Sequence, residues 1–360
     1  MGNITIADRT YSFTQIREGD WPSLSPYFHD AMIFCREWLL GRDTFTLHTS
    51  GSTGLPKEIT VLRRQMEISA KATRDFFKIS EGADLLCCLN VQMIAGKMML
   101  VRAMEWNANL YVVEPSSNPL TNISPDHKFH FVAMVPLQLG ECLQDPQTAL
   151  KVLNIHNLII GGASIDKDLK EKAALLPIHI YQTFGMTETV SHVALARIDK
   201  GEELIYKALP GVKFDVTAEN RLIISAPMGI SEQLLTNDIV ELISSSSFIW
   251  RGRADFTINS GGVKVQPEDL ENKMFPIMGL SFPGCRFFIF GEKDKNFGEK
   301  ICLVIEDKNQ SEDRAENLLQ DLKEKLPKYS IPKKIYRIVS FAETSSGKIN
   351  RPATIEKLQL

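Results

Sequence analysis

Hydroxyl side chains and glycines are concentrated in the stretch TSGSTGLPK, residues 49–57, which ends in Lys57. A glycine-rich turn exposes backbone N–H groups, and flanking hydroxyls add further donors, so such a loop can wrap phosphate oxygens. The stretch is not a Walker loop, because Leu55 and Pro56 separate Gly54 from Lys57. Taken alone, it indicates either a phosphate-binding loop or an ordinary surface loop.

A second group of chemically useful residues lies in TFGMTE, residues 183–188, directly after an expected strand. Thr187 and Glu188 would then project from the carboxyl end of that strand, where open α/β sheets bind their ligands. A carboxylate at this place suits Mg²⁺, which takes oxygen ligands together with substrate phosphates, and Phe184 offers a flat face for a base. The alternative is that Phe184 belongs to the core and Glu188 is a solvated residue at a helix start.

Further segments carry groups that fit the same chemistry, although each also has an ordinary explanation. IIGGAS (159–164) ends an expected strand with exposed backbone. In TNDIVEL (236–242), Asp238 opens an expected strand, and a carboxylate there can accept hydrogen bonds from paired ribose hydroxyls, but an aspartate in a turn is usually only a turn residue. RGRAD (251–255) and TSSGKINR (344–351) add Arg, Asp and Lys, of which the lysine would normally be exposed to solvent.

The composition excludes several classes of protein. Lys and Arg number 41 against 44 Asp and Glu, a formal net charge of -3, which argues against a dedicated nucleic-acid binder. The six cysteines include no C-x-x-C pair, so we expect neither a zinc site nor a disulfide framework, and a reducing cytoplasm as the compartment. We find no signal peptide, and no apolar stretch reaches the roughly 18 residues of a membrane helix, so no membrane insertion is expected.

Short apolar runs bounded by Gly or Pro predict buried strands over 129–136, 157–163, 178–185 and 221–227. Helical spacing over 137–153 lies between the first two. Strand–helix–strand alternation of this kind favours an α/β fold in which helices cover the faces of the sheet. Helical spacing also follows the opening motif, so we expect the glycine-rich loop to lie between a strand and a helix.

The pattern of expected elements changes after residues 251–262, a polar run that contains several glycines. This run indicates a domain boundary. Residues 285–307 predict two strands joined by a charged turn, and Ser311 is expected to cap a helix with a leucine stripe that includes Leu318 and Leu322. The fold class is therefore α/β, with a large N-terminal domain of mixed or parallel sheets flanked by helices and a small α+β C-terminal domain of about a hundred residues.

The order and spacing of these motifs resemble the adenylate-forming superfamily, which comprises acyl- and aryl-CoA synthetases, carrier-protein adenylation domains and luciferases. The resemblance covers almost everything from Thr49 onward, and LPKYSIPKKI (326–335) also fits it. It implies ATP, Mg²⁺ and coenzyme A as ligands, and a mobile C-terminal domain. The implied organisation is an AMP-binding domain at 1–252, a hinge at 253–255 around Asp255, and a mobile domain at 256–360.

The resemblance also implies roles for individual residues. Thr187 would contact the α-phosphate, Glu188 would bind Mg²⁺, and Lys348 would bridge the attacking carboxylate and the α-phosphate. Phe184 stands where the superfamily usually has a tyrosine that stacks on adenine, and Asn237 replaces the usual glycine before Asp238. The other implied nucleotide contacts are Thr49, Ser50, Gly51, Ser52, Thr53, Gly54 and Lys57 for the phosphates, Gly161, Gly162 and Ala163 beside adenine, and Asp238 and Arg253 for ribose.

The stretch YQTFGMTETVSHVALARI (181–198) is similar to the o-succinylbenzoate–CoA ligases of menaquinone synthesis. Their acid has one carboxylate to be activated and a second one to be held. We expect the holding set to come from Lys97, Thr189, Ser191 and His192. Where many relatives have a histidine of the acyl-pocket gate, this chain has Met93, and Lys97 is the candidate anion partner. The alternative for Lys97 is a helix residue whose stem packs and whose charge reaches water.

The sequence leaves some alternatives open. Another aryl- or acyl-CoA ligase, an enzyme that loads a carrier-protein thiol, and a nucleotide-binding protein without activity all share these motifs. Relatives usually have a hundred or so additional residues before the phosphate loop, so we expect a reduced N-terminal region or one completed by a partner. Whether the chain is a monomer or a homodimer stays open.

Overall fold

The computed structural model describes residues 2–48, 58–201, 203–295, 297–307, 312–343 and 349–358. The chain divides into two compact units. The first unit comprises Met1–Asp215, Ile223–Leu234 and Leu242–Ile249, and the second comprises Val216–Leu222, Leu235–Glu241 and Trp250–Leu360. The division at 253–255 that the sequence suggests stays a prediction.

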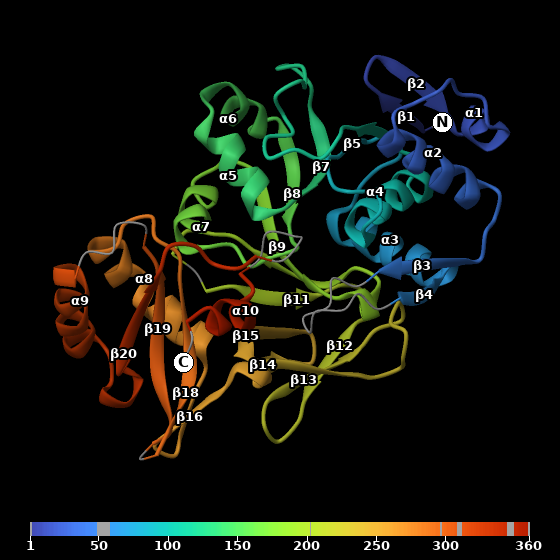
Figure 1. Ribbon diagram of the computed structural model, residues 1–360. Helices are drawn as coiled ribbons and strands as arrows, with labels where there is room; N and C mark the ends of the chain where they lie inside the picture. Colours follow the sequence, from blue (N-terminus) through green and yellow to red (C-terminus); the bar gives the residue numbers. More distant parts are fainter. Residues whose placement is uncertain are drawn as a thin grey trace. The chain divides into compact units, whose positions relative to one another are not determined.

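A large mixed sheet organises the first unit (Figure 1). Its strands lie in the order β11-β10-β9-β8-β7-β5-β6-β1-β2, and all neighbouring pairs from β9 to β1 are parallel. Strands β7 and β8 are almost wholly buried, as expected where helices cover both faces of a parallel sheet. The bounds are β1 Asn3–Ile6, β2 Arg9–Ser12, β5 Asp84–Cys87, β6 Asn109–Val112, β7 Phe129–Met134, β8 Ile155–Ile160, β9 His179–Gly185, β10 His192–Arg197 and β11 Ile205–Ala208.

Helices cover both faces of this sheet, which confirms the α/β class predicted from the sequence. Alternate residues of β7 divide between the two layers: Val132 packs with α5, α6 and α7, whereas Phe131 contacts Phe77 at the end of α3 and Trp106 after α4. The two groups of helices lie on opposite sides of the strands in Figure 1. The bounds are α1 Phe13–Glu18, α2 Pro26–Leu39, α3 Arg63–Phe77, α4 Ile94–Glu105, α5 Pro136–Gln144, α6 Pro146–Val152 and α7 Lys167–Ala173.

The structure differs from the sequence-based prediction at two helices. The segment 137–153 is not one helix, because Pro146 begins α6 and the Asp145 side chain caps that helix by accepting from the Gln147 N–H at 2.9 Å. Before α3, the strands β3 (Thr44–His48) and β4 (Glu58–Leu62) pair antiparallel. The glycine-rich stretch 49–57, which lies outside the described residues, is therefore bracketed by two strands, and β4 stands between it and the helix.

The same sheet continues from β11 through β15, β14, β13 and β12. Each of the four strands β12, β13, β14 and β15 contains residues of both units. Their bounds are β12 Lys213–Val216, β13 Arg221–Ser225, β14 Leu234–Ser244 and β15 Ser247–Arg253.

The second unit has a sheet of its own, ordered β17-β16-β19-β18, with β20 pairing parallel to β19. One face of the β18–β19 hairpin packs with α8 and α9 through Ile289 and Leu303, and the other packs with Phe341 through Phe288 and Val304. The hairpin and the leucine-striped helix confirm the sequence-based prediction, whereas Ser311 lies outside the described residues. The bounds are β16 Ile258–Ser260, β17 Val263–Val265, α8 Pro267–Ser281, β18 Phe287–Asp294, β19 Gly298–Glu306, α9 Glu312–Lys325, β20 Lys334–Ile338 and α10 Arg351–Glu356, with short 3₁₀ helices η2 Ala254–Phe256 and η3 Lys328–Ser330.

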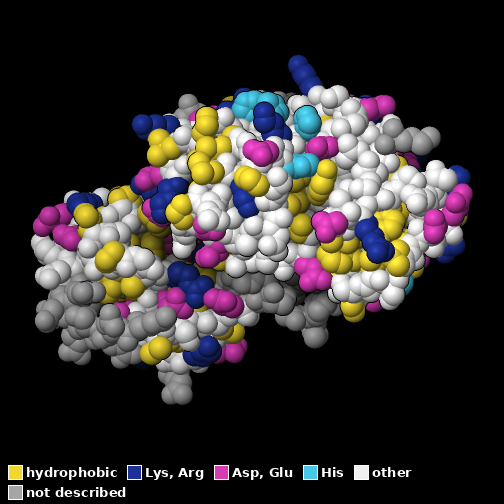
Figure 2. All heavy atoms as spheres, turned by 90° about the horizontal axis from the view of Figure 1, so that it is seen from above, with side chains coloured by type: hydrophobic (Ala, Val, Ile, Leu, Met, Phe, Trp, Pro, Cys, Tyr) yellow, Lys and Arg dark blue, Asp and Glu magenta, His cyan; other side chains and the backbone are white. Residues whose placement is uncertain are grey.

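The surface carries charges of both signs, and the cysteines are not bridged. On the face drawn in Figure 2, Lys and Arg side chains are interspersed with Asp and Glu. The six cysteines are free thiols; Cys285 is half-buried and the other five are buried. Among the described residues, no helix is both long and apolar enough to cross a membrane.

Candidate active site

The first group of predicted site residues lies at the carboxyl ends of β8 and β9. The parallel register pairs Ile160 with Gln182, so Gly161 follows β8 beside Thr183. A Cβ on Gly161 would lie 2.5 Å from Thr183 Oγ1, closer than van der Waals contact allows. A side chain at this position would therefore require the Thr183 side chain to move, whereas glycine lets the backbone of 161–163 approach the end of β9.

Gln182 holds this loop from its neighbouring strand. Its side-chain amide donates to the Ala163 carbonyl at 3.1 Å and its carbonyl accepts from the Ile165 N–H at 3.2 Å. Gly162 has φ +80°, the left-handed region that glycine adopts without strain. The structure thus brings the predicted residues Gly161, Gly162 and Ala163 to the same edge as the end of β9, and Gln182 is a supporting residue that sequence reasoning missed.

Phe184, the predicted adenine-stacking residue, is half-buried near the end of β9. Its ring meets Tyr206 and Phe248 edge-on, with centroids 5.7 and 5.0 Å apart. These contacts from β11 and β15 fix the plane of the ring. Whether the ring stacks on a base stays a prediction.

A tight turn carries Thr187 and Glu188 between β9 and β10. The short 3₁₀ helix η1 (Thr187–Thr189) follows Gly185, at which a Cβ would lie 2.4 Å from the Ser191 carbonyl oxygen. Val190 closes the turn with φ +66°, a costly conformation for a β-branched residue. The Thr189 hydroxyl reinforces the turn by donating within it, at 2.8 Å to the Ser191 carbonyl.

Glu188 is available as an oxygen ligand. The residue is half-buried, its backbone carbonyl accepts from the Ile230 N–H at 3.0 Å, and its carboxylate has no polar partner among the described residues. Those residues also contain no group of three or more His, Cys, Asp or Glu side chains that could hold a metal ion. A Mg²⁺ ion would fit here only with most of its oxygen ligands supplied by phosphate and water, which is its usual mode with nucleotides.

Ser191 and His192, two of the predicted substrate residues, meet a third residue that sequence reasoning missed. Arg102 of α4 donates through Nη2 to Ser191 Oγ at 3.0 Å and lies 3.5 Å from His192 Nδ1. The other ring nitrogen of His192 lies 3.2 Å from Thr73 Oγ1. Burial and the nearby Arg102 charge hold the pKa of His192 well below its ordinary value, so the imidazole is neutral.

Lys97 and Thr189 do not share the polar contacts of this cluster. The Lys97 ammonium donates to the carbonyls of Val91 at 3.2 Å and Gln92 at 2.9 Å, and it lies 5.9 Å from the centroid of the Phe34 ring. The Thr189 hydroxyl bonds within its own turn. The sequence offered one signal for Arg102, namely a second cation on the apolar helix that carries Lys97.

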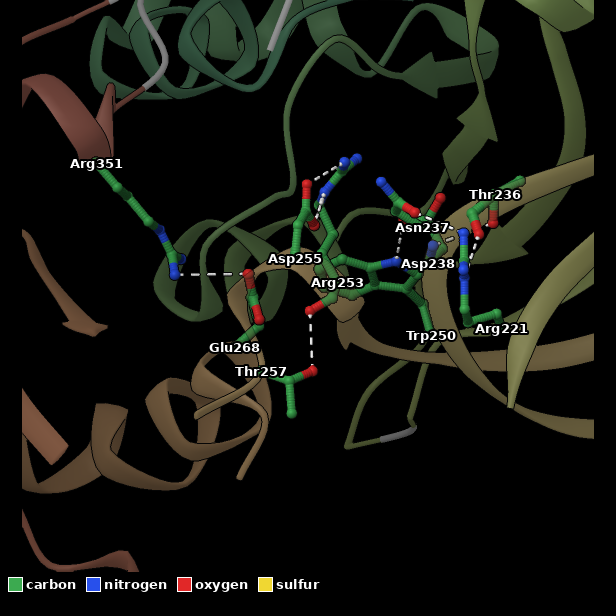
Figure 3. A network of polar contacts seen from close by, with 10 residues as sticks. All are labelled: Arg221, Thr236, Asn237, Asp238, Trp250, Arg253, Asp255, Thr257, Glu268 and Arg351. Carbon is green, nitrogen blue, oxygen red and sulfur yellow. Dashed lines mark hydrogen bonds and ion pairs between the residues drawn. The ribbon is translucent and has the colours of Figure 1, made fainter. Parts of the chain in front are cut away.

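The second group of predicted residues lies in the second unit (Figure 3). Asp238 does not open a strand as expected but lies inside β14, because pairing begins at Leu234. The carboxylate accepts from Trp250 Nε1 at 2.9 Å, and the Asp238 N–H donates to Thr236 Oγ1 at 3.1 Å. Burial raises the pKa of Asp238 despite the hydrogen bond from Trp250 and the charge of Arg253.

Arg253 and Asp255 form a two-pronged ion pair at the predicted hinge (Figure 3). Arg253 Nε donates to Asp255 Oδ1 at 2.9 Å, and Nη2 donates to Oδ2 at 2.8 Å. These bonds raise the pKa of Arg253. Burial alone would raise the pKa of Asp255, but the hydrogen bonds and charge of Arg253 outweigh it and lower that pKa. The charge of Asp238 also acts on Arg253, so one guanidinium and two carboxylates lie near one another, which suits the hydroxyl groups of a sugar.

A half-buried ion-pair cluster links α8 and α10 next to this stretch. Arg351 Nη2 lies 2.8 Å from Glu271 Oε2, and its Nη1 lies 3.5 Å from Glu268 Oε1. The guanidinium also lies over the Phe256 ring at 5.4 Å and the Phe288 ring at 5.7 Å. Arg351 thus ties the described part of the TSSGKINR motif to the body of the unit.

Two parts of the predicted site lie outside the described residues. They are the phosphate loop residues 49–57 and the segment 344–348 with Lys348. Their roles stay predictions.

Residues 41–222 match the AMP-binding enzyme family. The chain belongs to this family, as the motif resemblance predicted. It is 40% identical to the acyl-CoA synthetase (AMP-forming)/AMP-acid ligase II-like protein of Dyadobacter fermentans DSM 18053, whose crystal structure matches with a TM-score of 0.64 over 95% of this chain and 97% of that chain.

Two relatives that are named for their acid substrate share less identity with the chain. The chain is 25% identical over 337 residues to the 2-succinylbenzoate–CoA ligase of Staphylococcus aureus (strain MSSA476), covering 85% of this chain and 65% of that protein. The chain therefore spans less than two thirds of the length of this relative. The structure of the Bacillus subtilis o-succinylbenzoate CoA synthetase with its acyl-adenylate intermediate is 21% identical, with a TM-score of 0.70 over 85% of this chain and 68% of that one, which shows the shared fold.

Proposed function

We propose that this protein is an ATP-dependent acid–thiol ligase that activates o-succinylbenzoate as an acyl-adenylate and transfers the acyl group to coenzyme A, as a step of menaquinone biosynthesis. The single observation that supports it most is the meeting of Gly161–Ala163 with the Phe184–Glu188 segment at the carboxyl ends of β8 and β9, in a chain that belongs to the AMP-binding enzymes. This edge is where parallel α/β sheets bind nucleotides.

The chemistry asks for positioning and charge neutralisation. A carboxylate oxygen attacks the α-phosphorus of ATP, the bond to the pyrophosphate oxygen breaks, and the thiol of coenzyme A then displaces AMP from the mixed anhydride. Lys348 would hold the attacking carboxylate against the α-phosphate, which Thr187 would also contact, because the two anions otherwise repel one another. A bound Mg²⁺, held by Glu188 and phosphate oxygens, would reduce the charge on the triphosphate. No side-chain nucleophile is needed.

The assignment of the acid depends on the sequence around Ser191 and on relatives named for this substrate. GMTETVSHVA (185–194) is similar to the o-succinylbenzoate–CoA ligases. Staphylococcus aureus and Listeria monocytogenes proteins with that name are 25% and 23% identical to the chain. Both observations favour an acid with two carboxylates.

A second candidate is a ligase for a different aryl or acyl acid. It is favoured by Met93, which directly precedes α4 and stands where many relatives have a histidine. It is also favoured by the 40% identity to the Dyadobacter fermentans protein, whose name specifies no acid.

The test is pyrophosphate exchange and AMP release across a panel of carboxylic acids, with and without coenzyme A. We expect o-succinylbenzoate to support pyrophosphate exchange in the absence of coenzyme A. Net AMP release should follow when coenzyme A is added. Lys348→Ala should slow adenylate formation by at least about a hundredfold, the scale of losing one preorganised charge contact, while thioester formation from supplied acyl-adenylate survives. Exchange with another acid only would select the second candidate, and equal loss in both half-reactions would remove Lys348 from its assigned role.

A further inference from the structure

Arg102 is a cation enclosed within the first unit. The residue is 2% exposed. The partners of its guanidinium are Ser191 Oγ at 3.0 Å, His192 Nδ1 at 3.5 Å and Met99 Sδ at 3.6 Å, all of which are uncharged groups. Its Nε is buried and has no hydrogen-bond partner. Among the described residues, no carboxylate lies within ion-pair distance of it.

The surroundings of Arg102 do not neutralise its charge. Burial lowers the pKa of Arg102 to about 9, which still leaves the side chain protonated at neutral pH. Burial also raises the pKa of the nearby Cys87 thiol to about 11, so this thiol carries no charge. The face of the Phe131 ring, 5.7 Å away, offers only a weak attraction. Buried charges in proteins are normally paired, so the environment of Arg102 lacks an anion.

The position of this charge points to the substrate rather than to another part of the fold. Arg102, His192 and Thr73 are buried, whereas Ser191 is half-buried and is therefore the member of the cluster nearest to solvent. Ser191 is held by the strained Val190 turn, a few residues after Thr187 and Glu188. An anion that reached Ser191 would lie on the segment that carries the proposed adenylation residues.

We propose that Arg102, acting together with Ser191, holds the second carboxylate of a dicarboxylic acid substrate and selects for acids that carry it. The inference builds on the proposed function and replaces Lys97, whose ammonium is occupied by two backbone carbonyls, as the source of positive charge. The neutral His192 accepts from Arg102 and orients it, and Thr73 holds the other side of the imidazole ring.

The test measures acid binding separately from catalysis. Titration calorimetry would use o-succinylbenzoate and 4-oxo-4-phenylbutanoate, which lacks only the aromatic carboxylate. We expect the wild type to bind o-succinylbenzoate at least about tenfold more tightly than the analogue. An acid without the aromatic carboxylate leaves buried hydrogen-bond donors unpaired. Arg102→Met should bind both acids equally, Arg102→Lys should keep part of the preference, and Arg74→Met, a part-buried arginine of α3, is the matched control.

Stability distinguishes this role from a structural one. Arg102→Met removes an unpaired buried charge at similar volume, so without acid it should unfold at the same or a higher urea concentration than the wild type. A marked loss of stability, or equal binding of the two acids by the wild type, would overturn the inference. So would a loss of preference in Lys97→Met but not in Arg102→Met. If the binding preference is present but no pyrophosphate exchange occurs, the proposed function fails and the anion site stands.

Discussion

Gly161 lies so close to the neighbouring strand that a side chain there would displace the side chain of Thr183. A Cβ there would meet Thr183 Oγ1 at 2.5 Å, and relieving this clash would displace the loop beside the proposed adenine site. We expect Gly161→Ala to cost about 1–3 kcal/mol of stability and to raise KM for ATP at least about tenfold, because small misplacements are costly in active sites. Urea unfolding and initial-rate kinetics measure the two effects.

Two variants make this prediction specific. Gly140→Ala in α5 places a methyl group where nothing lies within 4 Å, so it should be neutral or slightly stabilising. The double variant Gly161→Ala, Thr183→Ala removes the clashing hydroxyl and should recover part of the lost stability. A stability loss unchanged by the second substitution would place the cost of Gly161→Ala elsewhere.

Residue types and order were enough to predict the family, but not the partners of individual side chains. Ser191 and His192 were predicted as substrate residues from their motif. Arg102 was missed because it lies far away in the sequence, and only folding brings α4 against β10. Lys97 was predicted in its place because it lies four residues after Met93, which replaces the usual histidine. Periodicity marks which face of a helix is buried, but not what a buried cation meets there.

At the scale of elements, the contact between α8 and α10 contains a carboxyl group whose charge depends on pH. Burial raises the pKa of Glu271 from 4.5 to about 7, although Arg351 opposes this shift. The Glu271 carboxylate also accepts from the Ile289 N–H at 2.7 Å, and Glu268 shares Arg351 with it. Between these two pH values the folded state therefore binds more protons than the unfolded state, and stability falls as pH rises.

We expect the free energy of unfolding of the wild type to fall relative to Glu271→Gln between about pH 4.5 and 7, by on the order of 1–3 kcal/mol, and the difference to level off above that range. Urea unfolding of both proteins at several pH values measures it. Asp269→Asn on α8, an ion-pair partner of Lys273, is the control. Parallel pH profiles for wild type and Glu271→Gln would mean that another group titrates.

Most elements followed from local patterns, and the exceptions have physical causes. The four buried strands predicted between residues 129 and 227 correspond to β7, β8, β9 and β13. The helix predicted over 137–153 is split because Pro146 can begin a helix but cannot continue one. Asp238 was expected to open a strand, with an ordinary turn residue as the alternative. It lies inside β14 instead, because pairing starts before it and its buried carboxylate accepts from Trp250.

For the whole molecule, the membership of the two compact units could not be predicted from the sequence. The second unit takes in 216–222 and 235–241, which lie before the predicted boundary. They are held by long-range contacts such as Thr236 Oγ1 donating to the Leu222 carbonyl at 3.1 Å. Contacts between residues far apart in the sequence cannot be recognised from a local sequence pattern. The polar run 251–262 is such a local pattern, and it was the basis of the predicted boundary.

The hinge proposal applies to the molecule as a whole. If the C-terminal domain turns about Asp255 between half-reactions, Asp255→Pro should restrict the backbone there. We expect one half-reaction to fall at least about tenfold more than the other, measured as pyrophosphate exchange and as thioester formation from supplied acyl-adenylate. Asp255→Ala removes the ion pair with Arg253 without fixing the backbone, and so is the control. Proportionate losses in a folded protein would argue against domain alternation.

Under the proposed function the protein forms a reactive acyl-adenylate, and the burial of its cysteines then has a consequence. An acyl-adenylate acylates whatever thiolate reaches it, including those of the protein that formed it. Burial raises the pKa of Cys87 and Cys142 to about 11 and of Cys302 to about 12, and it raises the pKa of Cys35 and Cys88 as well. Thiols in this state are both enclosed and protonated, so they are poor nucleophiles. If the proposed function holds, this burial would protect the five thiols from self-acylation and leave the activated acid to an incoming thiol.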